Sequence, residues 1–403
     1  MSKPLCVMLV ATEASGDDRG AGLAKSLRAR LGDQVRFIGT GGAQMAAQGV
    51  ESLFDIAQLS ILGVVDALAV YPRAMKLVNE MVAAATREKP DVVVLIDSWA
   101  FSLRVAHRLR KIAPSIPLVK YVAPQVWAWR KGRAKVLAGA VDHLLSIHTF
   151  DAPYFEAEGL PTTFVGNAAL KVYFSKADPA RLRKSLGISP QAPILLVLPG
   201  SRPSEISRVL PAFGEAAMRL KASHPELEIV IPAAPTVAAA VKAQVAGWPR
   251  RAHVVEGEQA KLDAMKAATA ALACSGTVTI ELALAGCPMV IGYRIDKLTY
   301  ALVNRLVKRP ITLFNIAAGT LVAPELIQDD CTPENLAREA ALRLENADIA
   351  GRQVAAQYGA LEKMGRGGPD PSDAAAEAIL KILAEPRPAW RAKKIRRTRG
   401  RGG

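Results

Sequence analysis

Residues 195–206 read LLVLPGSRPSEI, and this stretch predicts how the second half of the chain folds. An apolar run that begins at Ile194 predicts a buried strand, and Pro199 and Gly200 predict a tight turn after it. The polar residues that follow open an amphipathic helical pattern. A strand that leads through such a turn into a helix presents backbone N–H groups to an anion, and Arg202 adds a guanidinium that suits phosphate. The segment predicts a binding site for a nucleotide diphosphate. The alternative is that its glycine and serines serve only as helix caps.

The first half of the chain opens in a similar way. Residues 5–11 read LCVMLVA and predict another buried strand, which passes through a polar loop at 12–17 into a helical pattern. Strands that alternate with helices predict parallel sheets, whose ligands bind beyond the carboxyl ends of the strands. The sequence therefore predicts an α/β protein with two Rossmann-like, doubly wound domains that face a cleft. The expected strands comprise residues 5–11, 35–39, 91–96, 118–122, 143–147 and 163–165, then 194–198, 228–231, 253–255, 270–274 and 289–293.

The pattern also predicts domain boundaries. We expect a first domain at residues 1–168, a second at 169–365, and a C-terminal helix at 366–385 that packs back on the first domain. Residues 166–180 lack a clean periodicity and are the candidate hinge. The remaining residues, 386–403, are rich in proline, glycine and arginine, so we expect a disordered tail.

The charge balance is strongly basic, with a formal net charge of +15 on 403 residues. Eight cations of the tail have no acid among them: Arg387, Arg391, Lys393, Lys394, Arg396, Arg397, Arg399 and Arg401. Such a segment favours anionic membrane surfaces or nucleic acid, unless it is merely a solvated tail. An anionic-polymer-binding protein is therefore one hypothesis for the whole chain. The oligomeric state stays open, a homo-oligomer included, and no specific nucleic-acid partner is predicted.

Composition argues against several other classes. No apolar run reaches the roughly 18 residues that a membrane span needs. Glu13 interrupts the first apolar run early, so this run predicts a core strand rather than a secretory signal. The four cysteines have no ligand spacing, and no D-x-D pair follows a strand. We therefore predict no metal site and no cofactor, with buried free thiols in a cytoplasmic protein.

Several ordered motifs resemble one family closely, the lipid-A-disaccharide synthases, which are inverting glycosyltransferases with two Rossmann-like halves (the GT-B type). The resemblance covers about residues 4–383. Its motifs include residues 13–17 (EASGD), 96–97 (ID), 121–130 (YVAPQVWAWR), 164–166 (FVG), 198–202 (LPGSR) with Glu205, 275–277 (SGT) with Glu281, Asn315, and 324–326 (PEL) with Gln328. The chain departs from the family mainly at residues 99–102 (WAFS), where Pro-Asp-Phe-Asn is usual, and at 148–149 (HT), where Leu-Pro is usual.

The resemblance implies a reaction without a metal. A 2,3-diacylglucosamine would pass from its UDP derivative to O6 of 2,3-diacylglucosamine 1-phosphate, which gives a β-1,6-linked lipid A disaccharide 1-phosphate and UDP. It also implies that residues 1–168 are the acceptor side and 169–365 the UDP-sugar side. The location implied is the cytoplasmic face of a Gram-negative inner membrane, where the enzyme is peripheral. A related UDP-sugar transferase with another acceptor, or a UDP-sugar epimerase of similar plan, is the alternative enzyme.

Catalysis with inversion needs a base on the acceptor hydroxyl. Asp97 follows the buried run VVVLI, which places it at the carboxyl end of a strand, and the resemblance implies that it is that base; the alternative is a cap on the helix that starts near Phe101. Glu13 is a further catalytic candidate of unassigned role, in a loop where Asp17 is well placed for capping.

The other candidate residues bind substrate. For UDP and the donor we expect Gly200, Ser201, Arg202, Ser275, Gly276, Thr277 and Glu281, the last of these on the ribose hydroxyls by resemblance. For sugar or phosphate we expect Ser15, Arg130, Asn315 and Gln328, although Asn315 and Gln328 equally suit loop and helix-cap roles. Residues 61–82 have a broad apolar face and predict either an interfacial element for acyl chains or a buried core helix.

Overall fold

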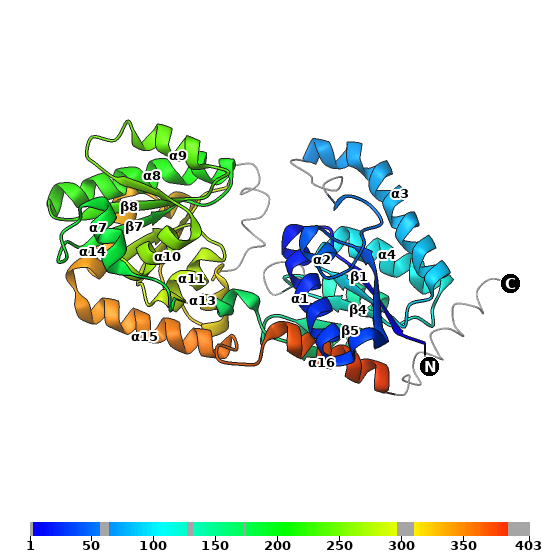
Figure 1. Cartoon of the computed structure of the whole chain (residues 1–403). Helices are drawn as coiled ribbons and strands as arrows, with labels where there is room; N and C mark the ends of the chain where they lie inside the picture. The colour runs from blue at the N-terminus through cyan, green and yellow to red at the C-terminus, as the bar shows by residue number, and fades with distance from the viewer. Residues whose placement is uncertain (1–2, 57–63, 127–131, 173, 296–309, 386–403) are drawn as a thin grey trace. The chain divides into compact units, whose positions relative to one another are not determined.

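The computed structural model describes residues 3–56, 64–126, 132–172, 174–295 and 310–385, with the side chains of 64–70 left out. Contacts between residues divide the chain into two units (Figure 1). Unit 1 comprises Met1–Gly166 and Gly368–Gly403, and unit 2 comprises Asn167–Gly367. Each unit contains a parallel six-stranded sheet with helices packed on it.

The sheet of unit 1 has the strand order β2-β1-β3-β4-β5-β6. Its strands are β1 (Leu5–Val10), β2 (Val35–Thr40), β3 (Val92–Ile96), β4 (Leu118–Tyr121), β5 (His143–Ser146) and β6 (Thr162–Phe164). Its helices are α1 (Ala14–Leu31), α2 (Ala43–Ala46), α3 (Val64–Glu88), α4 (Trp99–Ile112), α5 (Gly132–Ala140), α6 (Ala152–Glu156) and α16 (Pro371–Ala384), with a 3-10 turn at Gly32–Gln34. The central strands are apolar on both faces because helices cover both, as a doubly wound sheet requires.

The sheet of unit 2 has the strand order β12-β11-β10-β7-β8-β9. Its strands are β7 (Ile194–Leu198), β8 (Glu228–Ala233), β9 (His253–Glu256), β10 (Ala270–Ala273), β11 (Met289–Tyr293) and β12 (Glu325–Ile327). Its helices are α7 (Pro179–Leu186), α8 (Pro203–Ser223), α9 (Ala238–Val245), α10 (Glu258–Ala267), α11 (Val278–Ala285), α13 (Leu313–Ala318), α14 (Pro333–Glu345) and α15 (Ala347–Lys363), with 3-10 turns at Ala168–Lys171 and Gln328–Asp330.

Strands occupy all eleven ranges expected from the sequence, with ends that differ by at most two residues. The sequence pattern missed β12, a short edge strand whose buried residue is the charged Glu325 rather than an apolar residue. The last helix of the described chain, α16, packs beside α1, where Ala375 and Ile379 share a core with Leu23 and Leu27 (Figure 1). A segment from the end of the sequence thus completes the core of unit 1.

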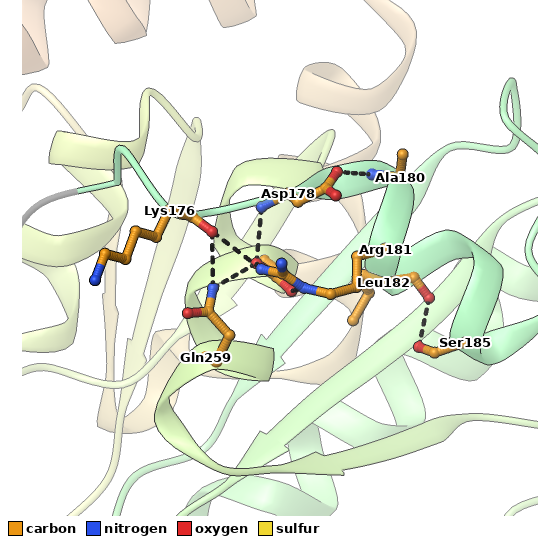
Figure 2. A network of polar contacts seen from close by, with 8 residues as sticks. Lys176, Asp178, Ala180, Arg181, Leu182, Ser185 and Gln259 are labelled. Carbon is orange, nitrogen blue, oxygen red and sulfur yellow. Dashed lines mark hydrogen bonds and ion pairs between the residues drawn. The ribbon is translucent and has the colours of Figure 1, made fainter.

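The candidate hinge at residues 166–180 is more ordered than its sequence suggested. It contains the 3-10 turn Ala168–Lys171 and the start of α7. Its second half is fixed to α10 by polar contacts, among them a hydrogen bond from Gln259 to the Lys176 carbonyl (Figure 2). Asp263 accepts two hydrogen bonds from the Arg181 guanidinium, both at 2.7 Å, and one from the backbone N–H of Asp178 at 2.8 Å. Gln259 donates to the same carboxylate at 2.9 Å. The hinge hypothesis therefore applies only to the residues before Lys176.

Residues 64–82 of the apolar stretch predicted at 61–82 form most of α3. Among its described side chains, Leu77, Val78, Met81 and Val82 are buried in the core of unit 1, whereas Tyr71 is exposed. The four buried residues agree with the prediction of a core helix. Residues 61–63 and the side chains of residues 64–70 lie outside the described part of the chain. Within the described residues, none of the helices is both long and apolar enough to cross a bilayer.

Candidate active site

Asp97 lies directly after β3, at the carboxyl edge of the sheet of unit 1. Its backbone adopts the left-handed region, with φ of 50°, and that of Ser98 does the same, with φ of 35°. This conformation is uncommon for residues other than glycine and is held only where the surroundings enforce it. The turn lets α4 begin at Trp99, only two residues after Asp97.

The Asp97 carboxylate contacts α1 rather than α4. Ser15 Oγ donates to its Oδ2 at 2.9 Å, and Arg19 Nη1 contacts the same oxygen at 2.5 Å. The residue at the cap position of α4 is Ser98, whose carbonyl accepts from the backbone N–H of Ser102 at 3.0 Å. The carboxylate of Asp97 therefore does not cap the helix, contrary to the alternative considered from the sequence. Because its side chain is 17% exposed, the carboxylate is shielded but accessible.

Two cations beside Asp97 were not identified from the sequence. Arg19 lies one turn after Ser15 on α1 and also donates to the Ser15 carbonyl at 3.0 Å. Lys120 lies inside β4, opposite Leu95 of β3, and donates to the backbone carbonyl of Asp97. Burial lowers the pKa of Lys120 to about 7, against the opposing effect of the Asp97 and Glu13 charges. A lysine within the apolar run PLVKYV was the signal in the sequence for this residue.

The loop before α1 divides its polar residues between two tasks. Glu13 occupies the cap position of α1 with its side chain exposed and makes no capping hydrogen bond there. Asp17 is buried and accepts the backbone N–H groups of Gly42, Gln44 and Met45, at 2.7 to 3.0 Å. The sequence suggested that Asp17 caps α1. The structure shows that it stabilises the start of α2 instead.

Unit 2 contains a pocket of about 630 Å³ at the carboxyl ends of β7 and β10. All seven residues predicted for UDP and donor binding line it: Gly200, Ser201, Arg202, Ser275, Gly276, Thr277 and Glu281. Its volume lies within the range typical of small-molecule sites. The walls also include residues 232–235 at the end of β8, Gly257, Glu258 and Lys261 of the α10 region, and Glu205.

The turn after Gly200 differs from the expectation of open backbone donors. Glu205 Oε2 accepts the backbone N–H groups of Ser201 and Arg202, at 3.0 and 3.2 Å. Glu205 Oε1 also lies 3.2 Å from Arg202 Nη1. This arrangement is a capping box, in which a glutamate in the first turn of a helix binds the backbone before it. The backbone donors of Ser201 and Arg202 are thus occupied, whereas the Arg202 side chain is 77% exposed.

Glu281 faces the pocket from α11 and forms an ion pair there. Lys261 Nζ lies 3.0 Å from Glu281 Oε2 and 2.9 Å from Glu258 Oε1. Burial by itself would lower the pKa of Lys261, but the two glutamates raise it above its ordinary value, so the amine stays charged. Glu281 is half-buried and not an ordinary exposed helix residue. The sequence did not identify Lys261 as a pocket residue, because its partner Glu281 lies 20 residues away on another helix.

Two predicted substrate residues are occupied by the protein itself. Asn315 is fully buried; its amide donates to the Ala323 carbonyl and to Glu325, and its oxygen accepts the N–H groups of Val322 and Ala323. Gln328 Oε1 accepts from the backbone N–H of Ile295 at 2.6 Å, and Gln328 Nε2 donates to the Ile295 carbonyl at 3.2 Å. These contacts favour the loop-stabilising alternative for both residues. Arg130 lies outside the described residues.

Solved structures of other proteins show the same fold. The chain is similar to a glycosyltransferase of kitacinnamycin (TM-score 0.60, 16% identity, 94% of this chain and 99% of that one). It is also similar to a putative UDP-N-acetylglucosamine 2-epimerase from Listeria monocytogenes (TM-score 0.58, 18% identity, 94% and 95%) and to MurG from Acinetobacter baumannii (TM-score 0.52, 17% identity, 94% and 100%). The fold is that of the GT-B glycosyltransferases, as predicted.

Sequence similarity identifies the family. The family model described as lipid-A-disaccharide synthetase matches residues 7–378. A lipid-A-disaccharide synthase from Rhodospirillum centenum is 42% identical over 384 residues, with 95% of this chain and 96% of that protein covered. Another from Rhodopseudomonas palustris is 43% identical over 380 residues, with 94% and 96% covered. The chain belongs to the lipid-A-disaccharide synthase family.

Proposed function

We propose that the protein joins UDP-2,3-diacylglucosamine to O6 of 2,3-diacylglucosamine 1-phosphate and releases UDP. Family membership supports this reaction. The observation that carries the proposal in the structure is the pocket of unit 2, which gathers seven residues from two separate sequence motifs at the carboxyl edge of one sheet. Ligands of doubly wound sheets bind at this edge.

On the donor side, Arg202 is the residue that we assign to the diphosphate. Its exposed guanidinium is held at one end by Glu205, which leaves further N–H donors for phosphate oxygens. The loop of Ser275, Gly276 and Thr277 leads into α11, whose N-terminal end favours negative charge. We assign Glu281, held by Lys261, to the ribose hydroxyls.

On the acceptor side, Asp97 is the proposed general base. Ser15 and Arg19 both bind Oδ2, so the carboxylate is oriented with Oδ1 as the oxygen that accepts a proton from the acceptor hydroxyl. The hydroxyl is a weak nucleophile, and the base removes its proton as the new C–O bond forms. As the bond from the anomeric carbon to the diphosphate breaks, the negative charge on UDP is stabilised by Arg202 and the N-terminal end of α11.

The product distinguishes this reaction from its alternatives. Mass spectrometry after incubation with the UDP-sugar lipid and the 1-phosphate acceptor should detect the disaccharide 1-phosphate and UDP. Disaccharide formed only with a different acceptor would favour a related transferase. A donor that changes in configuration without transfer, detected by NMR, would instead favour an epimerase, the activity named for several proteins of the same fold.

Substitution of Arg202 by alanine should weaken UDP binding ten- to a hundredfold. A charge-assisted contact of this kind contributes about 1.5–3 kcal/mol. Calorimetric titration of UDP measures the effect, and Arg352→Ala, which removes an exposed arginine of α15, serves as the charge-matched control. Equal UDP affinity of the Arg202→Ala variant and the parent protein would contradict the assignment.

Membrane association should be peripheral and salt-sensitive, because the net charge is +15 and eight of the cations counted in it lie in the tail. Attraction to an anionic surface is worth about 1 kcal/mol for each nearby cation and declines with ionic strength. Flotation with anionic liposomes at low and high salt tests this expectation. A chain that ends at Glu385 should bind anionic liposomes less tightly but retain transferase activity. A chain that has no transferase activity and whose binding of anionic polymers disappears with the tail would favour the anionic-polymer hypothesis. Binding that is independent of salt would point to apolar insertion instead.

A further inference from the structure

The conformation of Asp97 needs a physical cause. A left-handed φ at two successive residues, Asp97 and Ser98, is unfavourable unless the neighbouring structure enforces it. The Asp97 backbone is bound on both sides: its N–H donates to the Tyr121 carbonyl at 3.1 Å, and its carbonyl accepts from Ser102 Oγ at 2.9 Å. The Lys120 amine donates to that same carbonyl.

Lys120 is an unusual residue to place there. Its side chain is only 3% exposed and borders a small cavity lined mainly by apolar groups of Leu95, Trp99, Leu103 and Leu137. Its described hydrogen-bond acceptors are neutral oxygens, the Asp97 carbonyl and Ser102 Oγ at 3.4 Å. A buried amine without a direct carboxylate partner destabilises a folded protein relative to an apolar residue of similar length. Packing alone therefore gives no reason for a lysine at this position.

We propose that Lys120 is a positioning residue for Asp97: with Ser102, it holds the Asp97 carbonyl and thereby fixes the left-handed turn that directs the carboxylate toward Ser15 and Arg19. The inference rests on the proposed function, in which Asp97 is the base. The carbonyl contacts hold the backbone of Asp97, and the α1 contacts hold its side chain. The proton-accepting oxygen is thus set by three elements: β4 and α4 hold the backbone of Asp97, and α1 holds its side chain.

The decisive variant is Lys120→Met, which keeps the length of the side chain and removes the amine. We expect kcat to fall about 10- to 100-fold, because a base displaced by about 1 Å loses this much. The KM for the UDP-sugar should change less than threefold. Ser102→Ala should lower kcat in the same direction, and the two effects should not multiply in the double variant, because both residues act on one carbonyl. Lys25→Met, which removes an exposed lysine of α1, is the matched control.

Stability gives a second, independent readout. Burial lowers the pKa of Lys120 to about 7, from an ordinary value of 10.5; Asp97 and Glu13 oppose this effect, and Arg19 adds to it. Because unfolding raises this pKa, the wild-type chain is destabilised most below pH 7, and its stability recovers as the pH rises toward 10.5. Lys120→Met should therefore unfold at a higher urea concentration than the wild type at pH 7, and the difference should shrink at pH 9.

Lower kcat together with equal or higher stability supports the positioning role. Unchanged kcat in Lys120→Met overturns it, and so does a loss of activity that accompanies a loss of stability, because a merely structural lysine would produce that pattern. Asp97→Asn in the same assay distinguishes a failure of the proposed base, Asp97, from a failure of the proposed positioning residue, Lys120. If Asp97→Asn is inactive while Lys120→Met is active, only the role of Lys120 fails; if Asp97→Asn is active, the proposed base is wrong.

Discussion

Replacement of Asp97 by asparagine should lower kcat by about 10²–10⁴-fold, the range typical for removal of a general base. Asparagine preserves the shape of the side chain and an oxygen that accepts from Ser15, but it is not basic. The left-handed backbone should tolerate the change, because asparagine adopts this region more readily than most residues. Steady-state kinetics with saturating donor and acceptor would measure the loss.

The interpretation depends on what stays constant. UDP affinity should be unaffected, since the donor pocket is built entirely from residues of unit 2. The unfolding midpoint should change little, and Asp33→Asn, at an exposed aspartate after α1, controls for the removal of a negative charge. Near-native turnover of Asp97→Asn would exclude Asp97 as the base. A large loss of stability would instead indicate that the contact with Arg19 is mainly structural.

Much of the fold follows from the local sequence. Buried parallel strands such as β3 and β7 are continuous apolar runs, so the positions of Val92–Ile96 and Ile194–Leu198 could be predicted. The two-sheet plan followed from the alternation of such runs with helical patterns in each half of the chain. The edge strand β12 could not be predicted in this way, because its buried residue is the charged Glu325 and the strand forms no apolar run. The packing of α16 on α1 joins segments more than 340 residues apart, so it depends on a tertiary contact whose residues helix periodicity alone does not specify.

The donor site was predictable because its motifs are short and local. Each of the two segments, around Gly200 and around Ser275, reaches the pocket directly from the end of a strand. The partners that tune these residues were not predictable, because they depend on contacts between elements: Lys261 with Glu281, and Arg19 with Asp97. The occupied N–H groups after Gly200 fall between these cases. Glu205 stands three residues after Arg202, which is the spacing of a capping box. The spacing alone does not show whether the glutamate side chain turns back to bind these N–H groups.

The largest stability effect is expected from Asp263→Asn in unit 2. The Asp263 carboxylate is almost fully buried and binds Arg181 through two hydrogen bonds, with further donors from Asp178 and Gln259. Burial would raise the pKa of Asp263, but these donors hold it below the ordinary value. An asparagine offers one acceptor oxygen and places an amide group against the donors. We expect a loss of about 3 kcal/mol, the lower end for a broken buried ion pair, because the Arg181 side chain is 48% exposed.

Urea unfolding of the full chain at pH 7 measures this loss, with Glu362→Gln, at an exposed residue of α15, as the control for charge removal. Because the folded pKa of Asp263 is depressed, its contribution is present above the ordinary value of 3.8 and disappears as the pH falls through the folded pKa, so the two chains should converge only in strong acid. A difference below about 0.5 kcal/mol at pH 7, the usual scatter for surface substitutions, would contradict the prediction. The variant should also weaken UDP binding at temperatures where it remains folded, because α10 carries both the network of Figure 2 and Lys261 of the donor pocket.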